Sequence, residues 1–227
     1  MIVSVHQPNY LPYLGFFDKM AKSEKFVLYD STQYEKNGFQ NRNKIRTKDG
    51  WAWLTVPVSV SYGEMISKIK IVSGKWNKKH WASIEQNYSK APFFDSYKDA
   101  IKGIYSRDWG IISDLNTSII RAIAEILSIE TEIIIGSEMK VHTKSTQALL
   151  DMCIKLGADT YISGAGGREY LDENLFSRHG IKVLYQEYKH PTYPQVYDGF
   201  YPFMCVLDII FNIGAEKSLA KITGVVA

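Results

Sequence analysis

Two cysteines among 227 residues are too few to form a disulfide framework. Cys153 lies in an apolar run with helical spacing, which is typical of a small core residue. No apolar run approaches the roughly 20 residues of a membrane-spanning helix. The first residues also lack the basic segment and apolar segment of a secretory signal. These absences predict a cytoplasmic protein without a membrane span.

The chain also has little net charge and no histidine spacing that is typical of a metal site. The formal charge of +3 is too small to indicate a nucleic-acid partner. The five histidines show neither HxH nor HExxH spacing, which excludes structural zinc. Mg²⁺ stays open, because one or two carboxylates suffice when substrate phosphates supply other ligands, and the sequence names no cofactor. Aromatic residues, in contrast, make up 13% of the chain, and its 15 tyrosines suit sugars and bases.

Hydrophobic periodicity predicts an α/β fold with a mostly parallel sheet, flanking helices, a β-hairpin insertion and a helical insertion at about 76–128. Strands at 2–6 and 25–30 enclose a helix at 14–22, which makes a βαβ start. The Asp49-Gly50 pair predicts a hairpin between 41–47 and 51–58. We expect residues 1–227 to form one domain. Further strands are expected at 68–72, 132–135, 159–163 and 181–185, and helices at 76–87, 95–105, 111–127, 146–156, 170–176, 203–211 and 216–222.

The first strand ends on a histidine that is followed by a polar, proline-flanked loop. In open α/β sheets, ligands bind beyond the carboxyl ends of the strands, and imidazole suits proton transfer near neutral pH. We therefore predict that His6 is a general base. Gln7, Asn9 and Tyr10 are predicted to contact the substrate. The alternative is a strand-end histidine that is hydrogen-bonded to the backbone.

Asp30 ends the second strand much as His6 ends the first. If the two strands are parallel neighbours, both side chains emerge at the same edge of the sheet. Asp30 is therefore predicted as a second catalytic residue that orients His6, binds a sugar hydroxyl or holds Mg²⁺ through waters. The alternative is a turn cap. Gln33 and Lys36 follow closely and are predicted to contact the substrate.

A basic stretch at 41–46 forms the first strand of the expected hairpin. Alternation places Arg42, Lys44 and Arg46 on one face of that strand. The guanidinium fork suits phosphate or carboxylate, and the lysine adds a point charge. We predict that Asn41, Arg42 and Lys44 bind an anionic part of the substrate, the alternative being a solvated hairpin face.

Two further segments have the composition of an anion site. Lys79 and His80 lie near the start of the expected helix at 76–87, where backbone N–H groups favour an anion. The alternative is that this helix buries its tryptophans in the core and leaves the lysines in solvent. The segment 163–170 is rich in glycine and follows a strand, so Gly164 and Arg168 are predicted to hold phosphate. It matches neither a P-loop nor GxGxxG, and the alternative is a flexible turn.

A tyrosine-rich loop precedes the last long apolar helix. Tyr193 in this loop is predicted to stack on a base or a sugar. Asp208 and Asn212 stand four residues apart on one face of the helix, and a buried aspartate needs a hydrogen-bonding partner. This pattern favours pinning of the preceding loop over catalysis, and the sequence alone leaves both roles open.

The segments HQPNYLPYLGFFDK, VLYDSTQYEKNGFQNRNKIR, WLTVPV, KWNKKHW, ADTYISGAGGREYLDE and HPTYPQVYDGFYPFMCVLDIIFNIG together resemble the WbqC-like protein family. The resemblance covers nearly the whole chain. Members of this bacterial family are commonly encoded with genes for O-antigen and other surface polysaccharides, so it implies a role in making or modifying sugar building blocks. It implies no particular reaction. It departs at Cys205, where a serine is usual, which argues against an obligatory nucleophilic thiol.

Residue types and resemblance together predict a transferase that modifies a nucleotide-linked sugar in surface polysaccharide biosynthesis. The reaction would be acyl or aminoacyl transfer from a donor, with His6 as general base. One alternative is nucleotidyl transfer, although the segment 13–16 lacks both histidines of an HxGH motif. Another is a non-catalytic accessory protein that binds a sugar nucleotide or a glycan. The donor, the sugar and the oligomeric state are not specified by the sequence.

Overall fold

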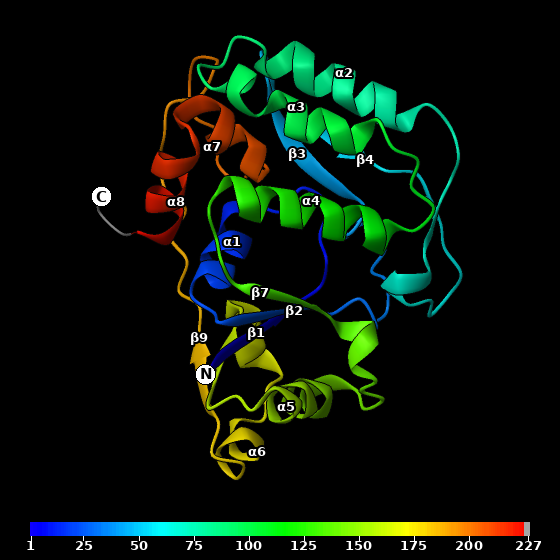
Figure 1. The fold of residues 1–227 in the computed structure, drawn as a ribbon, viewed down its shortest axis with the longest axis vertical. Coiled ribbons are helices and arrows are strands. Elements are labelled where there is room, and N and C mark those ends of the chain that lie inside the picture. Colours follow the sequence, from blue (N-terminus) through cyan, green and yellow to red (C-terminus); the bar gives the residue numbers. More distant parts are fainter. Residues whose placement is uncertain (225–227) are drawn as a thin grey trace.

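A computed structural model describes residues 1–224 and shows the predicted α/β architecture (Figure 1). Within these residues a sheet of five parallel strands runs in the order β7-β2-β1-β8-β9. Along the chain, this order is third, second, first, fourth and fifth, so its direction reverses between β1 and β8. That position is the topological switch point, at which open α/β sheets bind ligands. The strands are β1 (Ile2–His6), β2 (Lys25–Leu28), β7 (Glu132–Ile135), β8 (Thr160–Ser163) and β9 (Lys182–Tyr185).

Helices cover both faces of this sheet (Figure 1). One face carries α1 (Leu14–Ala21) and α4 (Ile112–Ile126), and the other carries α5 (Ser145–Leu156) and the short α6 (Glu173–Ser177). Four more helices extend the first layer away from the sheet, with α2 against α3 and α7 against α8. Their bounds are Trp76–Tyr88 for α2, Phe94–Tyr105 for α3, Val206–Ile213 for α7 and Ala215–Thr223 for α8. No helix within residues 1–224 combines the length and apolar character that crossing a membrane requires.

The central strands are mostly apolar because helices bury both of their faces, and the polar Ser4 of β1 is also buried. Side chains alternate along a strand. Phe26 and Leu28 of β2 accordingly face the core that contains α1 and α4, while Val27 faces the core that contains α5. In β1, Val3 and Val5 also point toward α5. This two-sided burial explains why short, largely apolar runs mark the strands in the sequence.

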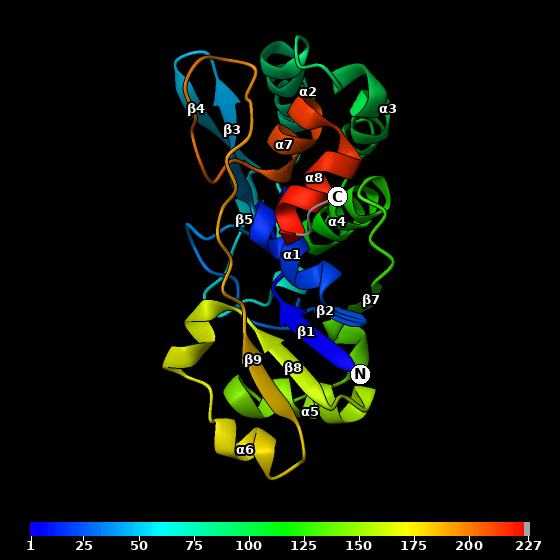
Figure 2. The same cartoon turned by 90° about the vertical axis from the view of Figure 1, so that its left-hand side faces the viewer.

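The predicted hairpin is present as β3 (Arg42–Thr47) paired with β4 (Gly50–Thr55). Figure 2 shows it at the end of the molecule that also holds α2, α3 and α7. Its turn lies at Lys48 and Asp49, one residue earlier than the predicted Asp49-Gly50 pair. Gly50 instead begins β4 with a φ of +134°, a conformation that a residue with a Cβ rarely adopts. A second small antiparallel pair joins β5 (Val58–Ser59) and β6 (Lys70–Ile71).

Two predicted helices begin later than expected. The helix expected at 170–176 begins at Glu173, because the Asp172 side chain caps it there by accepting hydrogen bonds from the backbone N–H groups of Asn174 and Leu175. The helix expected at 203–211 begins at Val206, because Phe203 has a φ of +61° and Cys205 is extended. Three single-turn 3-10 segments complete the described elements: η1 (Ile66–Lys68), η2 (Gly136–Met139) and η3 (Ala165–Glu169).

Candidate functional site

A pocket of about 760 Å³ opens beyond the carboxyl ends of β1 and β8, at the switch point of the sheet. We call it the β1–β8 pocket. His6, the last residue of β1, and Gln7 after it line the pocket, as do Ser163, the last residue of β8, and Gly164 after it, a predicted site residue. Its other lining residues are Val5, Lys19, Tyr29, Thr32, Glu35, Ser145, Leu149, Tyr161, Gly166, Gly167, Glu169 and Tyr170.

A second cavity of about 540 Å³ lies between the opening loop and the β3–β4 hairpin, and we call it the hairpin pocket. It shares His6, Gln7 and Glu35 with the β1–β8 pocket. Of these three shared residues, His6 alone carries an imidazole. The remaining lining residues are Asn9, Tyr13, Gly38, Phe39, Gln40, Asn43, Lys44 and Phe203.

The ring of His6 is held in one orientation and in one tautomer. Its Nδ1 lies 2.9 Å from the carbonyl oxygen of Gln7. A carbonyl accepts hydrogen bonds and cannot donate them, so Nδ1 carries the proton and Nε2 remains an acceptor. Phe16 packs against the ring with the centroids 4.9 Å apart. Burial, and secondarily the charge of Lys19, lower the pKa of His6 to about 3, so the imidazole is neutral near pH 7.

Distant side chains hold the opening loop in place. The Asn116 amide, from α4, donates to the Pro8 carbonyl at 2.8 Å and to the Gln40 carbonyl at 2.7 Å. The Asn43 amide, from β3, donates to the Leu11 carbonyl at 2.6 Å. This bond fixes Leu11 in an unusual left-handed conformation with a φ of +43°. The loop is therefore rigid because of tertiary contacts as well as its two prolines.

Lys19 was not predicted and lines the β1–β8 pocket. Only 2% of it is exposed, and its ammonium donates to the Val5 carbonyl at 3.1 Å. Burial lowers its pKa to about 7. Every residue of α1 from 14 to 20 is buried, so this helix has no solvated face for a lysine. The sequence signal is a lysine inside a short helix between two buried strands.

Glu35 and two phenylalanines are further lining residues that the sequence analysis passed over. Glu35 lines both pockets and accepts a hydrogen bond from the Gln7 amide at 3.3 Å. Phe39 and Phe203, which line the hairpin pocket, are 50% and 58% exposed. Large exposed apolar rings beside a cavity suit stacking on a flat ligand. The signal for Glu35 was its position between Gln33 and Lys36.

Asp30 lies at the same edge of the sheet but turns away from His6. One carboxylate oxygen accepts from the Ser137 backbone at 2.7 Å, and the other accepts from the Ser137 hydroxyl at 2.8 Å and the Ser113 hydroxyl at 3.4 Å. The predicted orienting role is therefore wrong, since Gln7 orients the imidazole. Asp30 lines a separate polar cavity of about 470 Å³ beyond β2 and β7. Within residues 1–224 no three His, Cys, Asp or Glu side chains are grouped as metal ligands.

Four predicted substrate contacts lie together in a third cavity, of about 830 Å³, and not in the β1–β8 pocket. They are Gln33, Lys36, Asn41 and Arg42. Asn41 is buried, and its amide donates to the Val56 carbonyl at 2.9 Å, which gives it a structural role in the hairpin. Among residues 1–224, Glu35 is the one residue that lines both this cavity and the two pockets at His6.

The cations of β3 differ from one another in their surroundings. Arg42 lies over the Trp53 ring at 4.5 Å, and Lys44 lies over the Trp51 ring at 4.1 Å, with both tryptophans partly exposed. Lys44 also lines the hairpin pocket, where a cation was predicted. Arg46 is buried, and its guanidinium donates to backbone carbonyls of the hairpin turn and of the loop before α7. The shared face of the strand thus carries two accessible cations.

His80 and Tyr10 lie in the core. The Tyr10 hydroxyl is 2.8 Å from Nδ1 of His80 and 2.5 Å from the Tyr105 hydroxyl. The prediction of an anion site at His80 is therefore wrong, because α2 buries this face together with Trp76. Burial lowers the pKa of His80 to about 4. Lys79 is exposed on the same helix and lines none of the cavities above.

The buried His80 predicts acid lability. The unfolded chain protonates this histidine near pH 6.5, whereas the folded chain protonates it near pH 4, so stability falls as the pH drops through this window. The expected loss is about 3 kcal/mol between pH 6.5 and 4. Urea unfolding at pH 7, 5.5 and 4.5 measures it. His80→Gln should make the pH dependence shallower but not remove it, because the buried His6 contributes in the same direction, and an unchanged slope in that variant would contradict the assignment.

Part of the glycine segment lines the β1–β8 pocket, whereas Tyr193 of the tyrosine loop lies in the core. Gly167 lines the β1–β8 pocket, and a Cβ there would lie 2.0 Å from the Ser163 hydroxyl, so the close turn of η3 needs glycine. Arg168 points elsewhere: its guanidinium pairs with Glu187 at 3.3 Å and lines none of these cavities. Tyr193 is buried, so the prediction that it stacks on a ligand is wrong.

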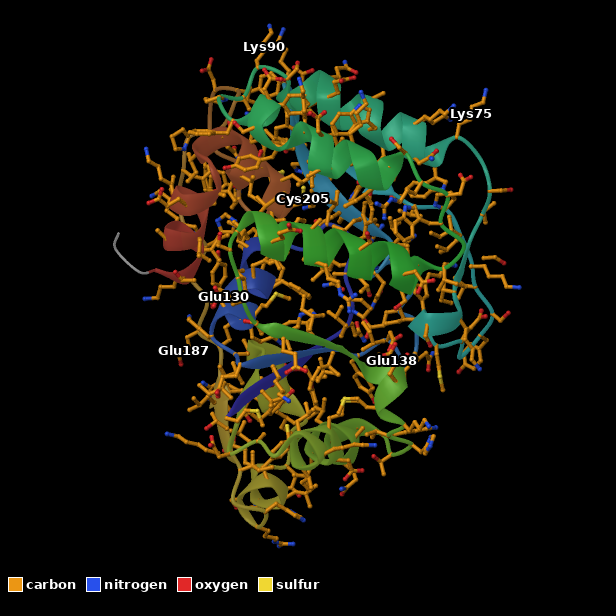
Figure 3. All side chains as sticks on the ribbon, in the orientation of Figure 1. Lys75, Lys90, Glu130, Glu138, Glu187 and Cys205 are labelled. Atoms are coloured by element: carbon orange, nitrogen blue, oxygen red, sulfur yellow. The ribbon has the colours of Figure 1, made fainter. Side chains whose placement is uncertain are left out.

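Asp208 holds the loop before α7, the role favoured by its position. Its carboxylate accepts from the Tyr88 hydroxyl at 2.9 Å, from the Tyr193 hydroxyl at 2.8 Å and from the Gln195 amide at 2.7 Å. Figure 3 shows Cys205 inside the molecule, while Lys75 and Lys90 point outward. Burial raises the pKa of the Cys205 thiol to about 12, so it is not a thiolate nucleophile near pH 7.

Comparison with known proteins identifies the family. The model of the WbqC-like protein family matches residues 7–219, which include the opening loop, the hairpin and the glycine segment. The chain belongs to the WbqC-like protein family. This WbqC-like protein is also 35% identical over 218 residues to "Uncharacterized protein Rv1507c" of Mycobacterium tuberculosis (strain ATCC 25618 / H37Rv), with 94% of each chain covered. The family match begins one residue after His6 and covers the lining residues of both pockets other than Val5 and His6, including Lys19 of α1.

Proposed function

We propose that this WbqC-like protein is a transferase that modifies a nucleotide-linked sugar in surface polysaccharide biosynthesis. The observation that supports this proposal is the neutral imidazole of His6, with Nε2 as an acceptor, in the wall that two cavities share. One cavity lies at the switch point, where α/β folds bind nucleotides. The family resemblance supplies the sugar context.

The two cavities suit the two halves of such a ligand. The β1–β8 pocket, of about 760 Å³, has the size of a cofactor site and holds the nucleotide in this proposal. The hairpin pocket holds the sugar, with Phe39 and Phe203 against its flat face and Asn9 and Lys44 toward its polar groups. His6 then lies at the boundary between nucleotide and sugar. The rigid opening loop keeps the imidazole in position without a conformational change.

The proposed reaction is acyl or aminoacyl transfer to an amine or hydroxyl of the sugar. The sugar nitrogen or oxygen attacks the carbonyl carbon of an activated ester or thioester donor. A new amide or ester bond forms as the bond between that carbon and the leaving group breaks. Nε2 of His6 takes the proton of the attacking group and passes it to the departing alcohol or thiol. The Gln7 carbonyl holds Nδ1–H throughout and stabilises the imidazolium that forms transiently.

Replacement of His6 tests this role. His6→Gln is expected to lower kcat by at least about a hundredfold, the usual contribution of a general base, with little change in ligand binding. The substrate is first found by a thermal-shift screen of sugar nucleotides, since a ligand at a hundred times its Kd adds about 2.7 kcal/mol. Turnover with acyl and aminoacyl donors is then followed by mass spectrometry. His179→Gln, at an exposed histidine, is the matched control.

Three outcomes would contradict the proposal. Full turnover by His6→Gln would show that His6 is not the general base. Release of pyrophosphate from a nucleoside triphosphate would show nucleotidyl transfer in place of acyl transfer. Tight binding of a sugar nucleotide, without turnover with any activated donor, would show an accessory binding protein.

A further inference from the structure

Lys19 has a position that the proposed chemistry does not explain. The side chain is 2% exposed and lines the β1–β8 pocket beside His6. Of its three N–H donors, one is directed to the Val5 carbonyl at 3.1 Å. Within residues 1–224 no carboxylate lies within ion-pair distance of its nitrogen. The neighbouring Asp18 pairs with Lys22 at 2.6 Å and accepts from Gln186.

A buried ammonium without a counter-charge is unfavourable in a folded protein. The neighbours of Lys19 supply no negative charge: the ammonium lies over the Phe26 ring at 5.8 Å, His6 is neutral, and the two acids of the pocket, Glu35 and Glu169, are exposed. Natural chains rarely keep such a group unless a ligand completes it. The titratable groups that line the pocket around Lys19 are His6 from β1, Tyr29 after β2, Glu35 in the loop, Tyr161 from β8, and Glu169 and Tyr170 at η3.

We propose that Lys19 is the cationic floor of a phosphoryl-binding site in the β1–β8 pocket, and that the ligand's phosphate supplies the counter-charge that the chain lacks. This inference rests on the proposed function for the placement of the nucleotide in that pocket. Two observations favour phosphate over a carboxylate. The pocket, at about 760 Å³, has room for a nucleoside diphosphate, and Thr32 and Ser145, which line it, carry hydroxyls that can donate to several phosphate oxygens.

The site has a measurable signature, namely proton uptake. With a pKa of about 7, most Lys19 side chains are neutral at pH 8 before the ligand binds. An adjacent phosphate favours the charged form, so binding raises this pKa and draws a proton from solution. The diphosphate itself is fully ionised at pH 8 and contributes no proton. We expect an uptake close to one proton per bound ligand.

Calorimetry with the full-length protein tests the site. UDP, dTDP and GDP, each beside its nucleoside and beside inorganic phosphate, are titrated at pH 8 in two buffers of different ionisation enthalpy. At least one diphosphate is expected to bind with proton uptake and at least tenfold more tightly than its nucleoside. Lys19→Met should abolish the uptake and weaken that diphosphate at least tenfold, leaving the nucleoside unaffected. Lys78→Met, at an exposed lysine of α2, should match the wild type.

Several results would overturn the site: no diphosphate binding at millimolar concentration, equal affinity for diphosphate and nucleoside, or unchanged uptake in Lys19→Met. Lys19→Arg, which keeps the charge, should retain diphosphate binding without uptake at pH 8, because arginine is always protonated. Failure of the transferase proposal is a separate result. If the protein binds diphosphates through Lys19 but transfers no group, the phosphate site stands and the transferase proposal fails. If the protein transfers a group but binds diphosphates equally well without Lys19, the transferase proposal stands and the phosphate site fails.

Discussion

Lys19→Met is expected to make the ligand-free protein more stable, although it removes a side chain from the floor of its candidate site. The folded pKa of about 7 compares with about 10.4 in an unfolded chain. At pH 7 the unfolded chain therefore binds a proton at this lysine that the folded chain binds much more weakly, which lowers the free energy of unfolding. This difference costs about 4 kcal/mol at pH 7. Methionine has a similar length and no charge, so it avoids that cost and gives up the hydrogen bond to Val5, worth about 1 kcal/mol.

The gain depends on pH in a defined direction. The unfolded chain binds more protons than the folded chain between pH 7 and 10.4, so wild-type stability rises with pH in this window. The cost of the buried lysine falls to about 2 kcal/mol at pH 9 and about 1 kcal/mol at pH 10. The stability curves of the wild type and Lys19→Met should therefore meet near pH 10.

Urea unfolding of both proteins at pH 7, 8, 9 and 10 measures this difference. We expect Lys19→Met to be about 3 kcal/mol more stable at pH 7. The exposed Lys78→Met should stay within about 0.5 kcal/mol of the wild type at every pH. A destabilised Lys19→Met at pH 7, or a difference that does not change with pH, would show that the ammonium is solvated or already paired.

Asp208→Ala is expected to have a comparable effect of opposite sign, a loss of about 4 kcal/mol. The substitution leaves the hydroxyls of Tyr88 and Tyr193 and the amide of Gln195 without their acceptor. Loss of one partner from a buried charged network costs about 3–5 kcal/mol. Gln195 also binds the backbone of Tyr201, so the effect extends along the loop before α7.

Urea unfolding and limited proteolysis together identify this role. Asp208→Ala should unfold at lower urea and should be cleaved faster within 190–204, since the loop loses its anchor. Asp208→Asn keeps one acceptor oxygen and should lose about half as much stability. Asp198→Ala, at an exposed aspartate of the same loop, is the control. A loss below about 1 kcal/mol in Asp208→Ala would mean that solvent or other groups satisfy these donors.

The sheet and the position of His6 could be predicted because both depend on local patterns. Short apolar strands followed by helices dictate a parallel sheet, and the carboxyl edge of such a sheet is where ligands bind. The switch point itself required the pairing of β1 with β8, strands that are more than 150 residues apart in the chain. Nothing in either segment encodes that partnership, because parallel pairing depends on the packing of the whole domain.

The misassigned residues share one cause: side-chain type was taken as a guide to exposure. Lys19 was overlooked because most helical lysines are solvated, yet α1 is enclosed on all sides. His80 was placed at a surface because its helix begins with lysines, yet it turns inward to Tyr10. Asp30 does reach the predicted edge, but its carboxylate accepts from the hydroxyl of Ser137 in η2, directly after the neighbouring strand β7, and not from His6. Such choices depend on neighbours that are remote in sequence.

The clamps on the opening loop have a consequence for synthesis in the cell. The loop at 8–12 is synthesised well before the groups that hold its carbonyls, which are the Asn116 amide and the backbone N–H of Val206. At about 5–20 residues per second, the later clamp arrives roughly ten seconds or more after the loop itself. Nascent chains therefore expose the apolar opening segment without a ligand-binding shape. The opening loop therefore reaches its final shape only after residue 206 has been made, and a chain stalled before that residue exposes the apolar segment to chaperones.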